Sequence, residues 1–417
     1  LRLLLLTLLS GSRAETDEKT VTVSKLDTNQ FSPVQDVRFV LYDVNRGEGF
    51  NLRRDVHMRV AIAVKKMREA GMNAVLVLPP WGGLYHWRDG KKGVRWSELF
   101  DLPSLSSFVP SIEFDQFLEA VGSPVIDRLV YLQHFEEGWG GEYVMKHEKR
   151  RCTEGDRYYE KEDGLWKGWF YGAEGVRARE MECVSFQGDS TTFAQMMATY
   201  EFKSIFIDRA ETMLHAEYGG TDYWRARRSM RYSKMLEERA ERFISDEMSE
   251  EIDAPPLTER WEDEKASRSS KGGAFVCAHW RRRDFVTSYG STLPSIEGAA
   301  KQMATLAGEF NVGKVFLATD ADEAEIEELR RHSKITVHTF RPSPDEKLID
   351  GAAAIVEQII CSWARAFAGS HQSTFTYRIQ EDREIRGFPA ETTFRRLCPD
   401  DVRMHGCEQP AKWKIVY

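Results

Sequence analysis

The chain alternates short apolar runs with longer amphipathic runs, and this alternation constrains its fold more than any other feature. Residues 37–44 (VRFVLYDV) have the β-branched and aromatic content of a buried strand, and residues 52–71 place apolar side chains on one helical face. A second strand pattern follows at residues 74–80, and another occurs near residue 205. Strand, helix and strand in succession predict a βαβ unit with a right-handed crossover.

The alternation restarts at residue 273. Strand patterns (AFVCAH, KVFLATD, ITVHTF, FAGS) alternate there with helix patterns (EGAAKQMATLAGEF, ADEAEIEELRRH, GAAAIVEQIICSWARAF, STFTYRIQ). The intervening residues 246–272 are acidic at first and then rich in Ser, Lys and Gly, which is typical of a linker. We therefore predict two doubly wound α/β domains, residues 36–245 and 273–417, with their ligands at the carboxyl ends of the strands.

Composition excludes several classes of protein. The 417 residues are 41% hydrophobic with a mean hydropathy of -0.49, which supplies sizeable cores and excludes a disordered or fibrous chain. The 58 Lys and Arg residues against 66 Asp and Glu residues give a net charge of -8. A mildly acidic chain lacks the basic surface of a general nucleic-acid-binding protein.

The first residues predict entry into the secretory pathway. Residues 1–14 contain a leucine run behind Arg2 and end in a small-x-small pattern, which predicts a signal peptide that is incomplete at its N-terminus. The run is too short to span a bilayer. A truncated signal-anchor is the alternative interpretation.

The six cysteines fit an oxidising compartment. Spacing favours the pairs Cys152–Cys183, which bracket a charged insert, and Cys398–Cys407, which flank a short polar loop. Cys277 and Cys361 fall within apolar strand and helix patterns, where a buried free thiol is the expectation.

Two segments of the second domain are suited to bind phosphate. The run His279-Trp280-Arg281 directly follows a predicted strand, and arginine forks bind phosphate oxygens in pairs. Ser373 and Thr374 lie where a strand gives way to a helix, so helix N–H groups and hydroxyls converge there. A structural Arg–Asp pair and a simple helix N-cap are the alternatives. With no P-loop and no GxGxxG motif, these segments suggest a nucleoside diphosphate ligand of another kind.

The first domain contains a candidate base. Glu48 lies between Gly47 and Gly49, where a carboxylate could approach a ligand unobstructed, although a solvated turn is the alternative. Asn51 could orient a hydroxyl group or cap the following helix. Four further side chains could form an aromatic acceptor surface or a core wall: Trp81, Tyr85, His86 and Trp87.

Asp320 and Asp322 form a D-x-D sequence after a predicted strand, which could hold a metal ion. We favour a helix N-cap with acidic residues in the first turn, which the helix dipole stabilises. Metal independence is therefore the prediction.

Several segments together resemble the protein O-fucosyltransferases that act on thrombospondin type 1 repeats. They are FVLYDVNRGEGFNLRRDV, VLPPWGGLYHW, the DRAE to RRSM run, HWRRRDF, KVFLATD, STFTYRIQ and CEQPAKWKI. The resemblance implies a GT-B fold and inverting transfer of fucose from GDP-fucose to Ser or Thr hydroxyls of folded repeats in the endoplasmic reticulum lumen. The rival interpretations are a fucosyltransferase for EGF-like repeats or glycans, and a non-catalytic GDP-sugar-binding folding factor.

The resemblance also implies roles for individual residues. Glu48 would be the general base, and Arg281 would bind the pyrophosphate with His279 and Trp280 beside it. Glu357 would read guanine. The family has an aspartate at this position, so the glutamate of this chain departs from the family pattern. The remaining donor-binding positions would be Gly47, Gly49, Phe50 and Asn51 at the fucose end, and Ser373, Thr374 and Phe375 at the phosphates. No cofactor or metal is implied.

Overall fold

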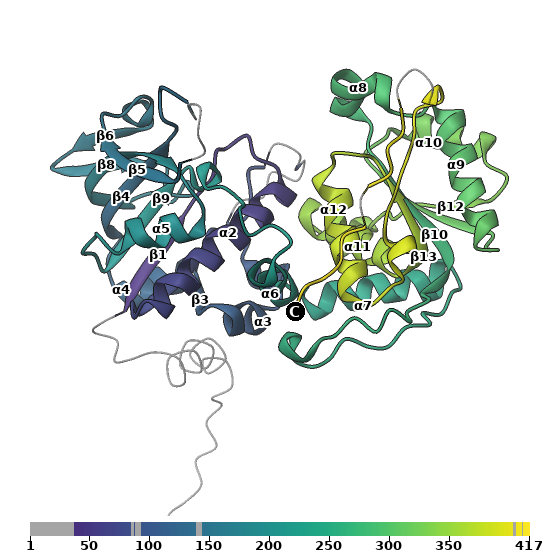
Figure 1. Cartoon of the computed structure of the whole chain (residues 1–417), viewed down its shortest axis with the longest axis horizontal. Helices are drawn as coiled ribbons and strands as arrows, with labels where there is room; N and C mark the ends of the chain where they lie inside the picture. Colours follow the sequence, from purple (N-terminus) through teal and green to yellow (C-terminus); the bar gives the residue numbers. More distant parts are fainter. Residues whose placement is uncertain (1–36, 85–86, 88–92, 139–143, 403–405, 411) are drawn as a thin grey trace, which may run out of the picture.

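The computed structural model describes residues 37–417, except 85–86, 88–92, 139–143, 403–405 and 411. Two α/β units lie side by side, each built on its own sheet (Figure 1). The predicted α/β class is confirmed. The predicted signal peptide lies outside the described residues. None of the helices in the described part is long and apolar enough to cross a membrane.

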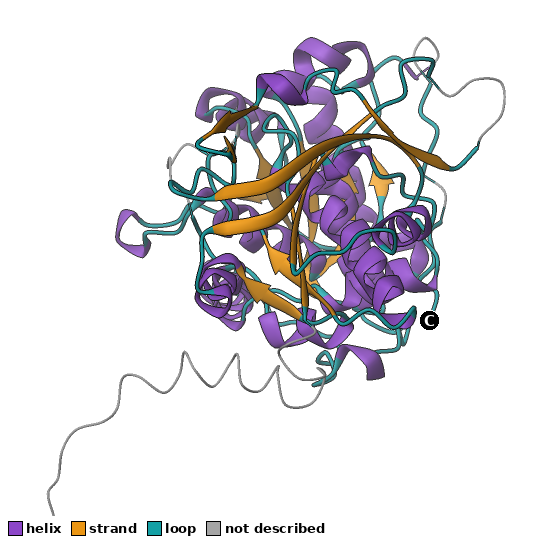
Figure 2. Cartoon of the chain, turned by 90° about the vertical axis from the view of Figure 1, so that its left-hand side faces the viewer, coloured by secondary structure: helices purple, strands orange, loops and turns teal. Residues whose placement is uncertain are grey.

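The first sheet has the order β3-β2-β1-β9-β4-β8-β7-β6, with β5 paired to β8. Its strands are β1 (Arg38–Tyr42), β2 (Ala74–Leu78), β3 (Ser111–Glu113), β4 (Val125–Gln133), β5 (Lys146–Arg150), β6 (Tyr159–Glu162), β7 (Leu165–Gly168), β8 (Arg177–Gln187) and β9 (Ser204–Asp208). The pairings from β3 to β8 are parallel, whereas β5, β6 and β7 add antiparallel pairings at one edge. Figure 2 shows the long, twisted strands of this sheet among helices.

Side-chain alternation in β1 explains why this sheet is buried on both faces. Val40 and Tyr42 point into one core cluster, and Leu41 points into another on the opposite face. The larger cluster includes the apolar face of α2 (Phe50–Glu69), and the smaller one includes part of α4 (Phe114–Val121). The unit also contains α3 (Leu102–Phe108), α5 (Ser190–Met197) and α6 (Thr221–Ser229).

The second sheet is parallel throughout its described strands, in the order β12-β11-β10-β13-β14. Its strands are β10 (Gly273–Trp280), β11 (Lys314–Thr319), β12 (Thr336–His338), β13 (Ala364–Gly369) and β14 (Arg395–Arg396). The helices are α8 (Arg283–Tyr289), α9 (Ile296–Glu309), α10 (Glu323–His332), α11 (Asp350–Ser362), α12 (Thr374–Ile385) and α13 (Ala390–Thr393). The predicted alternation after residue 273 is thus confirmed.

One cysteine prediction is wrong. Cys277 and Cys361 are not free thiols but form a disulfide, because α11 packs on β10 and brings their Cα atoms within 5.1 Å. The 84 residues between them hide this proximity in the sequence. The predicted Cys152–Cys183 pair is present.

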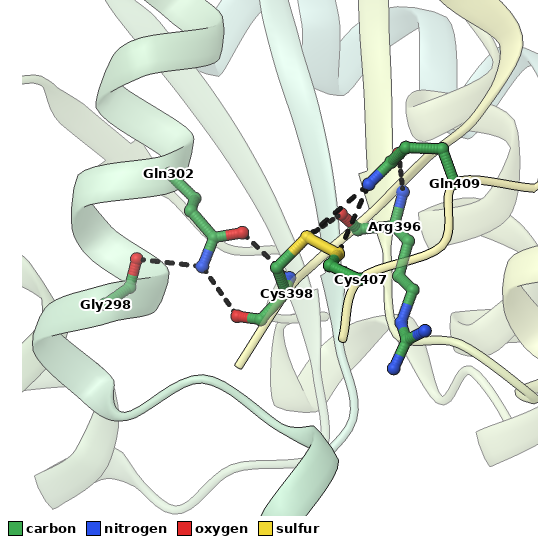
Figure 3. The surroundings of a disulfide bond; sticks show 6 residues. All are labelled: Gly298, Gln302, Arg396, Cys398, Cys407 and Gln409. Atoms are coloured by element: carbon green, nitrogen blue, oxygen red, sulfur yellow. Dashed lines mark hydrogen bonds between the residues drawn. A yellow bond between two sulfur atoms is a disulfide. The ribbon is translucent and has the colours of Figure 1, made fainter. Parts of the chain in front are cut away.

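The predicted Cys398–Cys407 pair is also present and anchors the C-terminal segment (Figure 3). The Gln302 amide from α9 both donates to the Cys398 carbonyl and accepts its N–H. The Gln409 amide contacts both sulfur atoms. The loop is therefore attached to α9 as well as closed by its own disulfide.

Residues 246–272 pack against the protein rather than hanging as a loose tether. Trp261 is buried against Phe108, and its carbonyl accepts a hydrogen bond from Arg228. The preceding helix α7 (Lys234–Arg242) contacts α11 of the second unit (Figure 1). This segment therefore forms part of the boundary between the two units.

Buried charges join the two units directly. The Arg227 guanidinium on α6 bonds the carboxylates of Glu381 and Asp382 on α12, at 2.6 and 2.5 Å. Tyr232 also donates to Asp382 (2.7 Å). Because each buried charge has an opposite partner, these contacts hold α6 and α12 in a fixed relation.

Candidate functional site

The loop after β1 carries Glu48 on a braced backbone. The Glu48 N–H donates to the Asn45 carbonyl (3.0 Å), which forms a tight turn. Arg53, one turn into α2, donates to the Glu48 carbonyl through Nε (3.1 Å) and to the Asn45 carbonyl through Nη2 (3.4 Å). The half-buried Glu48 side chain has no hydrogen-bond or ion-pair partner among the described residues. Its carboxylate is therefore available to a ligand.

Two acidic residues support this loop, and neither was predicted from the sequence. Asp43 directly follows β1 and accepts hydrogen bonds from Arg53 (3.3 Å) and from the Trp169 indole (3.1 Å). Glu211, in the turn after β9, accepts the Asn45 N–H (3.1 Å). The position of Asp43 at the carboxyl end of a buried strand was a usable signal. Glu211 reaches the loop only because β9 pairs with β1.

Neither glycine beside Glu48 has a backbone conformation that requires glycine. Gly49 has an ordinary φ of -75° at the N-cap of α2. A Cβ atom at Gly47 would meet only the Asn45 amide, at an ordinary 3.8 Å. The absence of side chains here leaves room beside Glu48 for a ligand.

Phe50 and Asn51 begin α2 and differ in environment. Phe50 is buried against Trp81, with ring centroids 4.8 Å apart. Asn51 is half-buried, and its Oδ1 accepts hydrogen bonds from Arg54 (3.2 Å) and from Gln358 of α11 (2.9 Å). Asn51 therefore connects the loop of Glu48 to the second unit.

The aromatic candidates after β2 have separate locations. Trp81 is a core residue, 3% exposed, as the core-wall alternative predicted. Trp87 is partly buried and packs at the start of α11, where a Cβ atom on Gly351 would come within 2.4 Å of it. Tyr85 and His86 lie outside the described residues.

The end of β10 holds the arginine candidate. Arg281 bonds Asp320 (2.5 Å) and Asp284 (2.6 Å) through its guanidinium, and its N–H donates to the Ser370 hydroxyl (2.9 Å). Two carboxylates thus fix the orientation of this guanidinium. The Trp280 indole is fully buried in the core, so only the Trp280 backbone can face a ligand at this strand end.

His279 and Phe375 form one wall of the same region. Their rings stack with centroids 4.3 Å apart, and His279 Nδ1 shares a hydrogen bond with the Thr376 hydroxyl (2.7 Å). Burial, assisted by the charge on Arg281, lowers the pKa of His279 to about 3. The imidazole is therefore neutral near pH 7 and contributes no charge to anion binding.

The start of α12 offers unpaired donors. Ser373 is the N-cap residue, but its hydroxyl makes no capping hydrogen bond, and the first turn contains no acidic side chain. Thr374 is exposed at the first helical position. The N–H groups of this turn and the positive end of the helix dipole favour an anion.

Glu357 lies on α11 next to Gln358. Its carboxyl group is desolvated, which raises the pKa to about 8, and the negative charge on Asp320 contributes to the increase. The positive charge on Arg341 opposes this increase. No hydrogen bond or ion pair joins Glu48 to Arg281, both of which are described.

Both carboxylates of the D-x-D sequence serve the protein itself. Asp322 caps α10 by accepting the Glu325 N–H (2.9 Å), which confirms the N-cap interpretation. Asp320 bonds Arg281 and the Arg282 N–H (2.7 Å).

Comparisons with known proteins agree across nearly the whole chain. The sequence profile of the family described as GDP-fucose protein O-fucosyltransferase matches residues 39–386. The GDP-fucose protein O-fucosyltransferase 2 of Caenorhabditis elegans is 48% identical, covering 95% of this chain and 94% of that protein. The Homo sapiens protein of the same name is 40% identical, covering 91% and 90%.

Solved structures show the same fold. The crystal structure of POFUT1 in complex with GDP-fucose aligns with a TM-score of 0.57 at 14% identity, covering 88% of this chain and 99% of that one. The fold is therefore the GT-B type, with two Rossmann-like units.

Proposed function

The chain belongs to the GDP-fucose protein O-fucosyltransferase family, and we propose that it transfers fucose from GDP-fucose to Ser or Thr hydroxyls of folded thrombospondin type 1 repeats. The observation that carries this proposal is the unpartnered Glu48 carboxylate on a loop braced by Arg53 and Glu211. A base needs a defined position and a free carboxylate, and this loop supplies both.

In this mechanism Glu48 acts on the acceptor. A Ser or Thr hydroxyl is a weak nucleophile, so Glu48 takes its proton as the oxygen bonds to C1 of fucose. The bond from C1 to the β-phosphate oxygen breaks, and GDP leaves with the electron pair. Attack from the face opposite to GDP inverts the configuration at C1.

The second unit acts on the departing GDP. Arg281 and the N-terminus of α12, with the hydroxyls of Ser373 and Thr374, stabilise the growing negative charge on the diphosphate. Because these groups are already oriented, no metal ion is needed in the proposed reaction. Glu357 accepts from the N–H groups of guanine, and Phe375 covers the phosphate side.

Redox chemistry supports the proposed location. All six cysteines are paired, which favours an oxidising compartment such as the endoplasmic reticulum lumen. Disulfide-bonded repeats fold in that compartment and would meet the enzyme there.

The test incubates the full chain with GDP-fucose and a folded thrombospondin type 1 repeat in EDTA, and then measures the intact mass of the acceptor. We expect one added deoxyhexose, which also tests metal independence. A folded EGF-like repeat is the parallel acceptor. Modification of that repeat alone would overturn the acceptor class, and donor binding without transfer to either would favour the non-catalytic folding factor.

A further inference from the structure

Four buried or half-buried polar side chains form a hydrogen-bond network between the two units, which continues through Tyr232 to Asp382. Arg54 and Asn51 come from α2, Tyr232 follows α6, and Gln358 comes from α11. Arg54 Nη1 donates to Gln358 Oε1 (2.7 Å) and to Asn51 Oδ1 (3.2 Å), and Gln358 Nε2 donates to Asn51 Oδ1 (2.9 Å). Arg54 Nη2 donates to the Tyr232 hydroxyl (3.0 Å).

The chemistry of arginine determines which way both amides point. A guanidinium can only donate hydrogen bonds, so the Gln358 atom facing Arg54 must be the oxygen. The Gln358 nitrogen then faces Asn51 and needs an acceptor there. Asn51 therefore turns its own oxygen toward both Gln358 and Arg54, and its amide orientation follows from the network.

The remaining end of Asn51 is free. No described residue accepts a hydrogen bond from Asn51 Nδ2, and the residue is half-buried at the start of α2, three positions from Glu48. Nδ2 is thus an unused hydrogen-bond donor near Glu48, where the proposed reaction takes place, and the diphosphate and fucose oxygens of the sugar nucleotide accept hydrogen bonds.

We propose that Gln358 and Arg54 are positioning residues that hold Asn51 as a hydrogen-bond donor toward an oxygen atom of the bound sugar nucleotide. Neither Gln358 nor Arg54 contacts the sugar nucleotide itself in this arrangement. Gln358 also follows Glu357 in sequence. The helix α11, which carries the residue proposed to read the base, therefore also orients the Asn51 amide. This inference rests on the proposed function, because that function assigns GDP-fucose to the site.

The proposal predicts an unusual order of effects for two substitutions. In Gln358→Glu, the carboxylate still accepts a hydrogen bond from Arg54 but cannot donate one to Asn51. The Asn51 amide therefore rotates so that its oxygen, instead of its nitrogen, faces the sugar nucleotide. In Gln358→Met, Asn51 Oδ1 still accepts from Arg54, so the Asn51 nitrogen continues to face the sugar nucleotide. Gln358→Glu, although it is nearly isosteric, should therefore weaken binding of the sugar nucleotide more than Gln358→Met.

Isothermal titration calorimetry with GDP-fucose measures this order without an acceptor. Losing one hydrogen bond to a charged or polar oxygen weakens binding on the order of 10- to 100-fold, and we expect that loss for Gln358→Glu. We expect a change of about threefold or less for Gln358→Met. If Gln358 served only the stability of the fold, Gln358→Glu would weaken binding less than Gln358→Met, because the carboxylate still accepts the hydrogen bond from Arg54. For the same reason, Gln358→Glu should melt no lower than Gln358→Met.

A double-mutant cycle separates reorientation of Asn51 from simple charge repulsion. In the Asn51→Ala background, Gln358→Glu should weaken binding no further, because no amide remains to reverse. A full additive loss in that background would overturn the proposal. Equal or tighter binding by Gln358→Glu than by Gln358→Met would also overturn it, whereas failure of the wild-type chain to bind GDP-fucose would overturn the proposed function instead.

Discussion

Burial sets the charge of the residue proposed to read guanine. Burial raises the pKa of Glu357 to about 8, so its carboxyl group is largely protonated in the folded protein at pH 7. Accepting two N–H groups requires the ionised form. As pH rises through 8, the fraction of ionised Glu357 increases, and less free energy is needed to deprotonate it during binding.

GDP affinity should therefore increase between pH 6 and pH 9. For a pKa of about 8, the expected increase approaches tenfold per pH unit below pH 8 and levels off above it. Calorimetry with GDP measures the affinity, and Glu357→Gln, which does not titrate, is the control. The same pH dependence in Glu357→Gln would contradict the assignment of the titrating group.

The base assignment predicts a separation of catalysis from binding. Glu48→Ala should lower kcat about 10²- to 10⁴-fold because no group takes the hydroxyl proton, while GDP binding persists. Initial rates of acceptor modification and calorimetry with GDP measure the two effects. Transfer at the wild-type rate by this variant would show that Glu48 is not the base.

Arg281 should affect both steps. Arg281→Ala removes the guanidinium proposed to bind the phosphates and leaves Asp320 and Asp284 without this ion-pair partner, so their negative charges repel the diphosphate. We expect GDP affinity to fall about tenfold or more and kcat/KM to fall on the order of 10²- to 10³-fold. Unchanged GDP affinity would exclude Arg281 from the phosphate site.

At the level of elements, the Cys277–Cys361 disulfide ties β10 to α11. β10 carries His279 and ends directly before Arg281, and α11 carries Glu357 and Gln358. One covalent bond thus connects the strand proposed to bind phosphate with the helix proposed to read the base. The strand-helix packing around it is buried, with both cysteines at 0% exposure.

Removing this disulfide should destabilise the protein more than removing Cys398–Cys407. Chain entropy predicts about 4 to 5 kcal/mol for a loop of 84 residues and about 2.5 kcal/mol for one of 9 residues. Urea denaturation of the two paired Cys→Ala variants measures the difference. Equal losses would show that loop closure does not control the stability of this unit.

For the whole molecule, the buried charges between α6 and α12 fix how the units meet. Arg227 is 1% exposed and bonds two carboxylates that belong to the other unit. Its loss would leave Glu381 and Asp382 buried without this partner. Removing one partner of a buried ion pair strongly lowers the free energy of unfolding, because the other charge stays buried without compensation.

Arg227→Ala should therefore destabilise the protein by about 3 to 5 kcal/mol. Arg260→Ala is the matched control, since it breaks an exposed pair with Glu262 and should cost about 0 to 1 kcal/mol. Urea denaturation followed by tryptophan fluorescence measures both. Similar midpoints for the two variants would indicate that the units are not held together by this cluster.

The sequence by itself determined the regular parts of this protein. Apolar periodicity depends on neighbouring residues, so it predicted β1, α2 and most of the β10 to α12 alternation. It missed α8, which has no buried residues, and it extended the α11 pattern into residues that form β13. The charged strand β5, with sequence KHEKR and three exposed central residues, has no such pattern and was not predicted. Short-range chemistry also predicted the two disulfides that close short loops.

Only the tertiary structure decided the contacts between distant segments. The Cys277–Cys361 pair, the support of Asn45 by Glu211 and the bond from Gln358 to Asn51 join residues 84, 166 and 307 positions apart. No local pattern encodes such distances, because they arise when sheets pair and helices pack. The sequence thus predicted which residues would bind phosphate and act as a base, whereas packing determined which side chains contact those residues.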